Sequence, residues 1–536
     1  MKHNTFIKKA LNGFSILTLF IFLGGFYLYV GVGHPVLYIF LTITLLFKIV
    51  KILFEWYHFF SLYHKEKKLN KPIAENAYTV DMLTTACPGE PFGMISATLN
   101  AMVAVKYPHE NYLCDEGNDP KLIELCKKLG VRHVTRQTHE NAKAGNINNA
   151  LKIATGDICV IMDPDHEPFP DFLDHVLAPF DDPNVGYVQV VQAYKNQSDS
   201  LIAQAAAEQT YLFYGPYMEA MGKYGTAQAI GANCTFRRKA LDSIGGHAPG
   251  LTEDMHTSML LHAKGWKSVY VPKILSLGLV PSSLAAYYQQ QLKWSRGTFD
   301  LLVNTVPNLF SKFTSRQKLH YLLLPVYFLF GLIGVIDIGV PIYSLMTGEY
   351  PWILNPVIFF AFFTPFLLAT LSQRFYAQKW LHRPNEKGIH LLGGVLRVGT
   401  WWVYTIGFVY TLLNIKVPYI PTPKEHSSKG DFILGFPNLI ISALSIGSAI
   451  YGLNSDWQPY SFMMAGFAIL NGIVFFLAFT MGQSILVENL RRSWFILKNL
   501  FFLKKAELTY VKLSRYGVPV AVLFPISVFY NQCLKF

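Results

Sequence analysis

The sequence is poor in cysteine and in charge for its length. Its 536 residues include six cysteines, which show none of the paired spacings typical of zinc sites, and we expect reduced thiols. Charged residues make up 15% of the chain, whereas hydrophobic residues make up 51%. That balance excludes an ordinary soluble enzyme, and no internal repeat or low-complexity segment is found. The composition therefore predicts a membrane protein.

Long apolar runs lie on both sides of a more polar middle region. Each run is near the length that a helix needs to cross a bilayer, about 20 residues. We predict six spans, at Phe14 to Gly31, Val36 to Phe54, Tyr321 to Met346, Trp352 to Leu371, Leu434 to Leu453 and Phe462 to Gly482.

Basic residues flank the outer ends of the first two runs. Three lysines precede the first run, and four follow the second, at Lys65, Lys67, Lys68 and Lys71. Because positive charge stays on the cytosolic side, we expect a multi-pass protein of the plasma (inner) membrane with a cytosolic middle region. A signal peptide is the alternative for the first run, but a second span follows it almost at once. The net charge of +12 fits basic loops beside anionic lipid, and we expect no nucleic-acid partner.

Two other apolar segments are expected to lie at the membrane surface. Leu391 to Leu413 is long enough to span, but it contains Arg397 and lies between basic loops, so a crossing would place one basic loop outside. Val518 to Tyr530 is short and contains two prolines.

Short strands alternate with helices in the middle region. The predicted strands are Thr79 to Leu83, Tyr112 to Cys114, His133 to Val134 and Gly156 to Met162. One helix is predicted from the turn that begins at Pro88 through to Ala104. Two more are predicted at Lys121 to Leu129 and at Gly145 to Ala154. This order predicts a mostly parallel sheet covered by helices, with ligands at the carboxyl ends of the strands.

Asp163 and Asp165 directly follow the last of these strands, two positions apart, and can project to one side. Two carboxylates suit Mg²⁺ or Mn²⁺, which takes oxygen ligands and shares them with substrate phosphates. A helix cap or a solvated turn is the alternative for an isolated acidic pair. A nucleotide diphosphate is the ligand that the pair could hold.

Further clusters follow in a fixed order: Asp115-Glu116-Gly117 precedes the pair, and Thr252-Glu253-Asp254 and Gln290-Gln-Leu-Lys-Trp294 follow it. With these clusters, the segments Asn141 to Leu151 and Gly231 to Arg238 resemble the processive, inverting family 2 glycosyltransferases of the cellulose synthase and hyaluronan synthase group. The likeness covers most of the chain. Three positions depart from the family pattern: Glu116 replaces an aspartate, Ile230 a cysteine and Lys293 an arginine.

The resemblance implies a cytosolic GT-A-like α/β domain inserted between transmembrane helices. It implies Asp254 as general base and a metal at Asp163 and Asp165. It places the nucleotide sugar beside Glu90, Asp115, Lys143, Asp163, Lys293 and Arg296, and the acceptor and channel mouth beside Gly231, Glu253, Gln290 and Trp294.

Each residue also has a simpler interpretation. Thr252 is a good N-cap for the helix that follows, and Lys143 alone would be a solvated lysine at a helix start. Gln290 and Trp294 are four apart, so they share a helical face that could instead lie at the lipid headgroups.

The segment Tyr419 to Lys424 resembles the gating loop of cellulose synthases. By that resemblance Thr422 and Lys424 contact the diphosphate when the loop closes. The likeness favours the cellulose synthase side of the group.

We expect a processive transferase that polymerises a UDP-sugar, most readily UDP-glucose into a β-glucan, and passes the growing polysaccharide through its own membrane helices. The alternatives are a non-processive transferase to a lipid acceptor and an inactive transporter or scaffold. Membrane lipid is an expected partner, and the sequence does not determine whether accessory secretion subunits bind. The expected regions are 1–60 (membrane hairpin), 72–283 (glycosyltransferase domain), 284–318 (interfacial helices), 319–372 and 434–482 (helix pairs), 373–433 (interfacial helix and gating loop) and 483–536 (tail).

Overall fold

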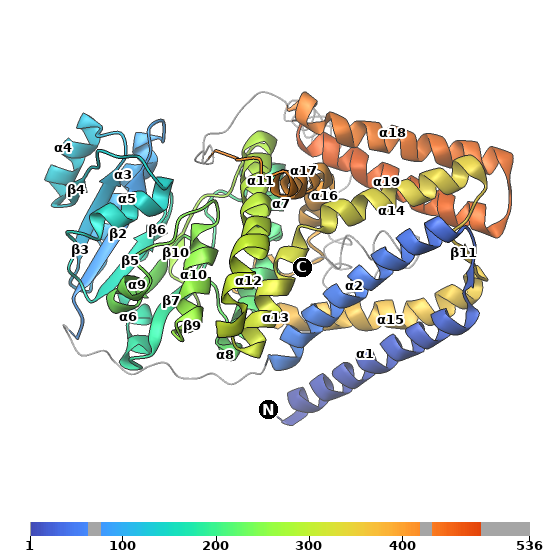
Figure 1. Ribbon diagram of the computed structural model, residues 1–536, viewed down its shortest axis with the longest axis horizontal. Coiled ribbons are helices and arrows are strands. Elements are labelled where there is room, and N and C mark those ends of the chain that lie inside the picture. Colours follow the sequence, from blue (N-terminus) through green and yellow to red (C-terminus); the bar gives the residue numbers. More distant parts are fainter. Residues whose placement is uncertain (1, 63–76, 419–430, 484–536) are drawn as a thin grey trace, which may run out of the picture.

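The structure, a computed structural model, describes residues 2–62, 77–418 and 431–483. A sheet with its covering helices forms one end of the molecule, and long helices form the other (Figure 1). The predicted loop at Tyr419 to Lys424 and the predicted segment Val518 to Tyr530 lie outside the described residues.

The central sheet has seven strands in the order β4-β3-β2-β5-β8-β7-β9. Its neighbours pair in parallel except around β8, which runs antiparallel to both β5 and β7. The predicted, mostly parallel sheet is thus confirmed. The strands are β2 (Val80–Ala86), β3 (Glu110–Asp115), β4 (Arg132–Val134), β5 (Ile158–Met162), β7 (Val185–Val191), β8 (Cys234–Arg237) and β9 (Lys267–Ile274).

Helices cover both faces of this sheet. Successive side chains of a strand point to opposite faces, so Val160 packs with α3, α4 and α6, whereas Ile161 packs with α5, α9 and α10. Burial on both faces explains why β2, β5 and β7 are buried along their whole length. The helices are α3 (Phe92–Val103), α4 (Pro120–Leu129), α5 (Ala142–Ala150), α6 (Phe172–Val176), α9 (Arg238–Ser243) and α10 (Glu253–Ala263).

A second set of helices connects the sheet to the long helices. They are α7 (Leu201–Glu208), η2 (Phe213–Tyr217), α8 (Met218–Tyr224), α11 (Leu284–Asp300), α12 (Val306–Leu309) and α13 (Ser315–Leu323). Ser283 caps α11, since its hydroxyl accepts a hydrogen bond from the Ala286 amide at 3.3 Å. The hydroxyl of Tyr224 on α8 donates to the carbonyl of Tyr57 at 2.7 Å, which joins the sheet domain to a long helix.

Among the described residues, six helices are long and apolar enough to cross a membrane. They are α1 (Lys2–Tyr29), α2 (Pro35–Ser61), α14 (Phe330–Thr347), α15 (Pro356–Ala377), α18 (Phe432–Ser455) and α19 (Pro459–Met481). Short antiparallel pairs join connecting segments: β1 (Gly31–Val32) with β11 (Trp352–Ile353), and β6 (Glu167–Pro168) with β10 (Ser276–Leu277).

Several predicted helices differ from the structure. Trp352, predicted to begin a span, lies in β11, and α15 begins at Pro356. The helix predicted at Gly145 to Ala154 is α5, Ala142–Ala150.

Two further differences have a visible cause. The span expected from Tyr321 begins only at Phe330, because Pro325, which has no amide hydrogen, follows the end of α13 and begins the short turn η5 (Pro325–Tyr327). Leu391 to Leu413 is not one helix but two, α16 (Leu391–Gly399) and α17 (Trp401–Leu412). At the break, Tyr288 and Asn438 donate to the Gly399 carbonyl at 3.1 and 3.0 Å.

Candidate active site

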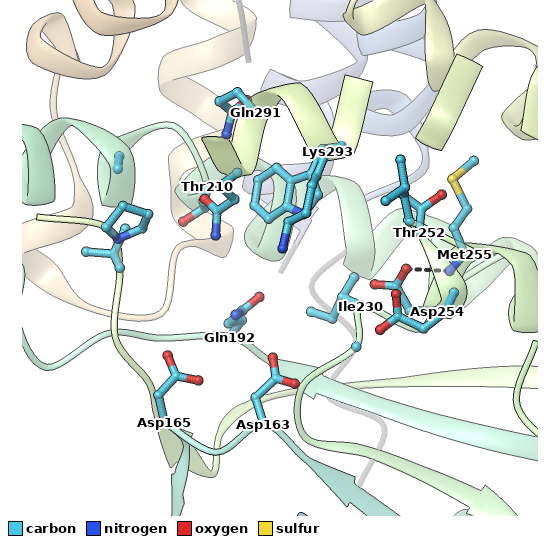
Figure 2. A pocket seen from close by; sticks show the side chains of 18 of the residues that line it. Asp163, Asp165, Gln192, Thr210, Ile230, Thr252, Asp254, Met255, Gln291 and Lys293 are labelled. Carbon is cyan, nitrogen blue, oxygen red and sulfur yellow. Dashed lines mark hydrogen bonds between the residues drawn. The ribbon is translucent and has the colours of Figure 1, made fainter. Parts of the chain in front are cut away.

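A cavity of about 340 Å³ lies between the carboxyl ends of the sheet strands and the helices α7 and α11. This is the size of a small-molecule site. Most of the predicted site residues line it, namely Glu90, Lys143, Asp163, Asp165, Gly231, Glu253, Asp254, Gln290, Lys293 and Trp294. Figure 2 shows Asp163 and Asp165 on one side, Lys293 pointing toward them from the other, and Asp254 at the right of the view, beside Met255.

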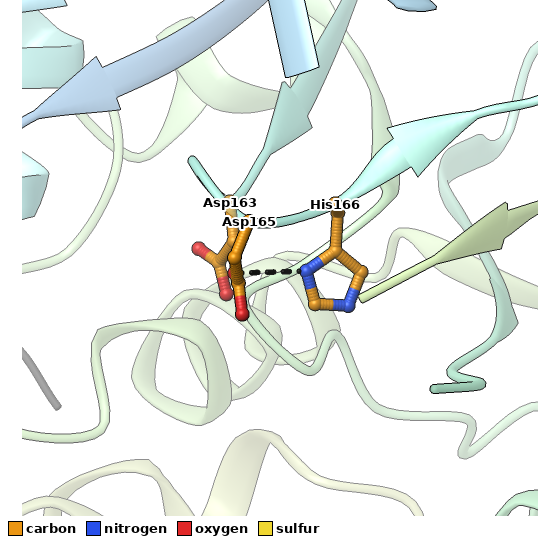
Figure 3. Close-up of side chains that lie close together, drawn as sticks. All are labelled: Asp163, Asp165 and His166. Carbon is orange, nitrogen blue, oxygen red and sulfur yellow. Dashed lines mark hydrogen bonds and ion pairs between the residues drawn. The ribbon is translucent and has the colours of Figure 1, made fainter. Parts of the chain in front are cut away.

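The two aspartates lie where β5 ends, as the sequence predicted. Asp165 is buried, and its Oδ1 lies 3.1 Å from Nδ1 of His166, which is also buried (Figure 3). One donor atom from each of Asp163, Asp165 and His166 lies within 4.8 Å of the others. Two carboxylates and an imidazole form a donor set that fits Mn²⁺ or Mg²⁺.

Lys143 lies beside this acidic group, in the first turn of α5. Its ammonium contacts Oδ1 of Asp163, donates to the Gly231 carbonyl at 2.9 Å and lies 3.6 Å from Oε1 of Glu253. The residue is 9% exposed, so the interpretation as a solvated lysine is wrong. One cation thus joins three segments that are far apart in the sequence.

Asp254 lies in the first turn of α10, and its Oδ1 accepts a hydrogen bond from the Met255 amide at 2.7 Å. Thr252 occupies the N-cap position, but its side chain makes no capping hydrogen bond. Burial, together with the negative charge of Glu253, raises the pKa of Asp254 from 3.8 to about 7. A carboxyl that titrates near neutral pH can exchange protons with a ligand.

Gly231 allows Asp254 to reach the cavity. Its φ of +74° favours glycine, and a Cβ at this position would lie 3.1 Å from Oδ2 of Asp254. Any larger residue would push the carboxylate aside.

The opposite wall is built from α11. Gln290 and Trp294 both line the cavity, which confirms that they share a helical face, and Lys293 lines it too. Four further aromatic side chains line the cavity, those of Tyr214, Tyr287, Tyr327 and Phe328.

Several cavity residues were missed by sequence reasoning. His166 directly follows Asp165, so its place in the motif could have identified it as a third donor. Gln192, Tyr214 and Tyr327 offered no such signal, because each comes from a different element and only the tertiary structure brings them to the cavity.

Two predicted residues lie outside the cavity lining. Asp115 is 2% exposed, and its carboxylate accepts hydrogen bonds from the amides of Gly117 and Asp119 at 2.9 and 2.7 Å and pairs with His133. Arg296 bonds Asp300 at 2.9 Å and the Ile415 carbonyl at 3.2 Å. The other two predicted residues, Thr422 and Lys424, lie outside the described residues.

Two protein families match overlapping parts of the chain. Residues 84–297 match "Glycosyltransferase like family 2", and residues 233–381 match "Cellulose synthase". Together the matches contain the cavity residues from Thr85 to Phe328. Residues 84–381 of the chain are thus similar to family 2 glycosyltransferases and, in their second half, to cellulose synthases. The family predicted from the motifs is confirmed.

The curated relatives of this chain are distant. Cellulose synthase 1 of Komagataeibacter xylinus is 23% identical over 441 residues, which are 77% of this chain and 27% of that protein. The UDP-forming cellulose synthase catalytic subunit of Pseudomonas fluorescens is 27% identical over 290 residues, 52% of this chain and 39% of the subunit. The chain thus spans less than half the length of these relatives.

Among solved structures, the mannosyltransferase PcManGT from Pyrobaculum calidifontis, in complex with GDP-Man and Mn²⁺, aligns with 76% of this chain and 100% of its own. The identity is 14% and the TM-score 0.44. The residues that the structure describes form a mostly parallel sheet with two candidate transmembrane helices before it and four after it, as predicted.

Proposed function

We propose that this protein is a processive, inverting glycosyltransferase that polymerises a UDP-sugar, most readily UDP-glucose into a β-glucan, and passes the polymer through its own membrane helices. One observation carries the proposal: three groups face the same cavity. They are a set of side chains that could bind a metal ion (Asp163, Asp165 and His166), the carboxyl of Asp254 with its raised pKa, and the helix α11 that carries Trp294. Its relatives carry the names of cellulose synthases, and several of them are named UDP-forming.

The donor would lie against the sheet wall. Asp163, Asp165 and His166 would hold Mn²⁺ or Mg²⁺, which when bound neutralises charge on a diphosphate. Lys143 adds a cation at the same place. It also joins the donor side to Gly231 and to Glu253, which begins the helix α10 that carries Asp254. Lys293 approaches from α11 with charge but without the two-pronged geometry of an arginine (Figure 2). Glu90 also lines the cavity, and its carboxylate accepts a hydrogen bond from the Cys87 amide at 2.8 Å. We assign it to the nucleotide sugar.

The acceptor would lie between Asp254 and Trp294. A sugar hydroxyl becomes a good nucleophile only when a base accepts its proton, and ionised Asp254 takes that role. Attack from the side opposite the leaving diphosphate inverts the anomeric carbon. Trp294 offers a flat apolar surface for the sugar ring, and Gln290 offers hydrogen bonds to its hydroxyls.

Processive elongation requires the product to move away without leaving the protein. Tyr287, Tyr327 and Phe328 line the cavity, and the last two lie just before the start of α14, the first long helix after the sheet domain. We propose that the polymer leaves the cavity past these three aromatic rings, toward the long helices. We also propose that the sheet domain faces the cytosol of a plasma-membrane protein and that the regions predicted from the sequence are its domains.

The decisive experiment supplies purified protein in lipid nanodiscs with radiolabelled UDP-glucose and Mn²⁺ or Mg²⁺. We expect UDP release together with a high-molecular-weight product that linkage-specific β-glucanases digest, and neither with the Asp254→Asn variant. Label recovered only in the organic, lipid-soluble fraction would favour transfer to a lipid acceptor instead. Absence of turnover with every UDP-sugar offered would favour the inactive scaffold.

A further inference from the structure

A single arginine beside the donor wall holds together a turn that leads into α5. We infer that Arg136 is a positioning residue of the donor site: its guanidinium holds the strained turn Glu140 to Ala142 and thereby sets Lys143 against Asp163. The inference rests on the proposed function, because that function assigns Lys143 to the nucleotide sugar.

Arg136 makes four hydrogen bonds through three nitrogens. Its Nε and Nη2 donate to the two carboxylate oxygens of Glu116, each at 2.8 Å. Its Nη1 donates to the Glu140 carbonyl at 2.6 Å, and Nη2 also donates to the Ala142 carbonyl at 3.0 Å. The side chain is 4% exposed, so these bonds are shielded from water. A planar guanidinium has enough donors, in a forked arrangement, for all four bonds, whereas an ammonium has three donor hydrogens.

The turn that Arg136 holds is strained. Asn141 and Ala142 both have left-handed backbone angles, with φ of 60° and 44°. Asparagine tolerates this region, but alanine does so only at a cost, and two such residues in succession are uncommon. Strain of this kind persists when the surrounding contacts enforce it.

The turn is also pressed against α5. A Cβ at Gly145 would lie 2.0 Å from the Glu140 carbonyl oxygen and 2.5 Å from Nη1 of Arg136. A glycine in the interior of a helix is destabilising, so its presence here is explained by this close approach. The helix start, the turn and the guanidinium therefore form one packed unit.

Lys143 is the residue directly after this turn. Its ammonium reaches Asp163, Gly231 and Glu253 from the first turn of α5, so the path of Asn141 and Ala142 decides where the ammonium lies. A relaxed turn would redirect α5 at its start and withdraw the cation from the acidic group.

Glu116 anchors the guanidinium to the sheet. Its amide donates to the carbonyl of Ala86, the last residue of β2, at 2.9 Å. Burial opposes ionisation, but hydrogen bonds from Arg136 and His139 hold the pKa of Glu116 below its ordinary value. Glu116 is one of the positions that depart from the family pattern, and the longer side chain is the one that bonds Arg136 here.

The test measures UDP affinity in the presence of Mn²⁺ for full-length protein in nanodiscs. We expect Arg136→Gln to weaken binding about tenfold, and Arg136→Lys to weaken it nearly as much because the fork is lost. The double variant Arg136→Gln with Ala142→Gly should recover most of the affinity, since glycine adopts the left-handed conformation without strain. Recovery by glycine is a result that a general loss of stability would not produce.

Matched variants separate the possible outcomes. Arg132 forms a more exposed pair with Glu110 beside the same sheet edge, at 3.0 Å, so Arg132→Gln should leave affinity unchanged. If Arg136→Gln folds poorly, Glu116→Gln should show a smaller loss that Ala142→Gly also reverses. Affinity within about twofold of wild type in Arg136→Gln, or failure of glycine to restore it, would overturn the inference. Unchanged affinity in Lys143→Gln would instead remove Lys143 from the donor site, and with it the proposed role of that residue.

Discussion

The two walls of the cavity differ in chemistry. The sheet wall carries charge, with Lys143, Asp163, Asp165 and Asp254 placed at strand ends and helix starts. The α11 wall, apart from Lys293, presents amides and aromatic rings, of which Trp294 is the largest. Charge suits a metal-bound diphosphate, whereas flat rings and amides suit sugars. The contrast supports the proposal that donor and acceptor occupy opposite walls.

Asp254→Asn tests whether the sheet wall both binds the nucleotide and activates the acceptor hydroxyl, through different residues. We expect transfer to fall by about a thousandfold while UDP affinity stays unchanged, because the carboxylate acts on the acceptor hydroxyl and not on the nucleotide. Sugar transfer and UDP titration should be measured on the same preparation. The control is Asp242→Asn, which changes an exposed partner of Arg238. Near wild-type turnover in Asp254→Asn would remove the base from this position.

Asp165→Ala should affect the donor itself. We expect UDP affinity and turnover to fall together by about a hundredfold, because the acidic group loses a ligand for the metal that neutralises the diphosphate. Titrating UDP with and without Mn²⁺ measures this. Asp171→Ala, which disrupts an exposed pair with His175, is the control. Affinity that is equal with and without metal in the wild-type protein would separate Asp165 from a metal role.

The pH dependence should be opposite for activity and for stability. Asp254 must be ionised to accept a proton, so kcat/KM should fall about tenfold for each pH unit below its pKa and level off above it. Its pKa in the folded protein is raised to about 7 from 3.8, mainly by burial. Folding therefore favours the protonated form, and this contribution to stability is lost as the pH rises from 3.8 through about 7.

Asp254→Asn removes the ionisable group, so it should raise the Tm at pH 8 relative to wild type while abolishing transfer. A pH profile of kcat/KM that stays flat through pH 6 would contradict the raised pKa. The Tm of both proteins at acidic and alkaline pH gives an independent measurement of the same shift.

Trp294→Ala should have the smallest effect of the set and should be confined to the acceptor. We expect polymer yield to fall about tenfold with UDP affinity unchanged, and Trp294→Phe to retain most of the yield because a flat ring remains. Trp457, which is 75% exposed at the turn between α18 and α19, gives the control variant Trp457→Ala. A loss of UDP affinity in Trp294→Ala would mean that the two walls are not separate.

Much of the fold could be predicted because its signals are local. Apolar runs of span length predict the long helices, and short apolar strands between helical segments predict a mostly parallel sheet. The start of α14 and the break between α16 and α17 could not be predicted from apolarity. Pro325 interrupts the first run, and the Gly399 carbonyl is bonded by side chains from α11 and α18.

By itself, the sequence determined the family, the six long helices and the residues that could do chemistry, because their order along the chain carries that information. Only the tertiary structure decided which of them meet. It placed Asp115 and Arg296 off the cavity and brought His166, Tyr287 and Tyr327 to it. It also raised the pKa of Asp254, because burial, the largest cause, and the approach of Asp163 act through space. These effects depend on distances between residues far apart in the chain, and such distances exist only after folding.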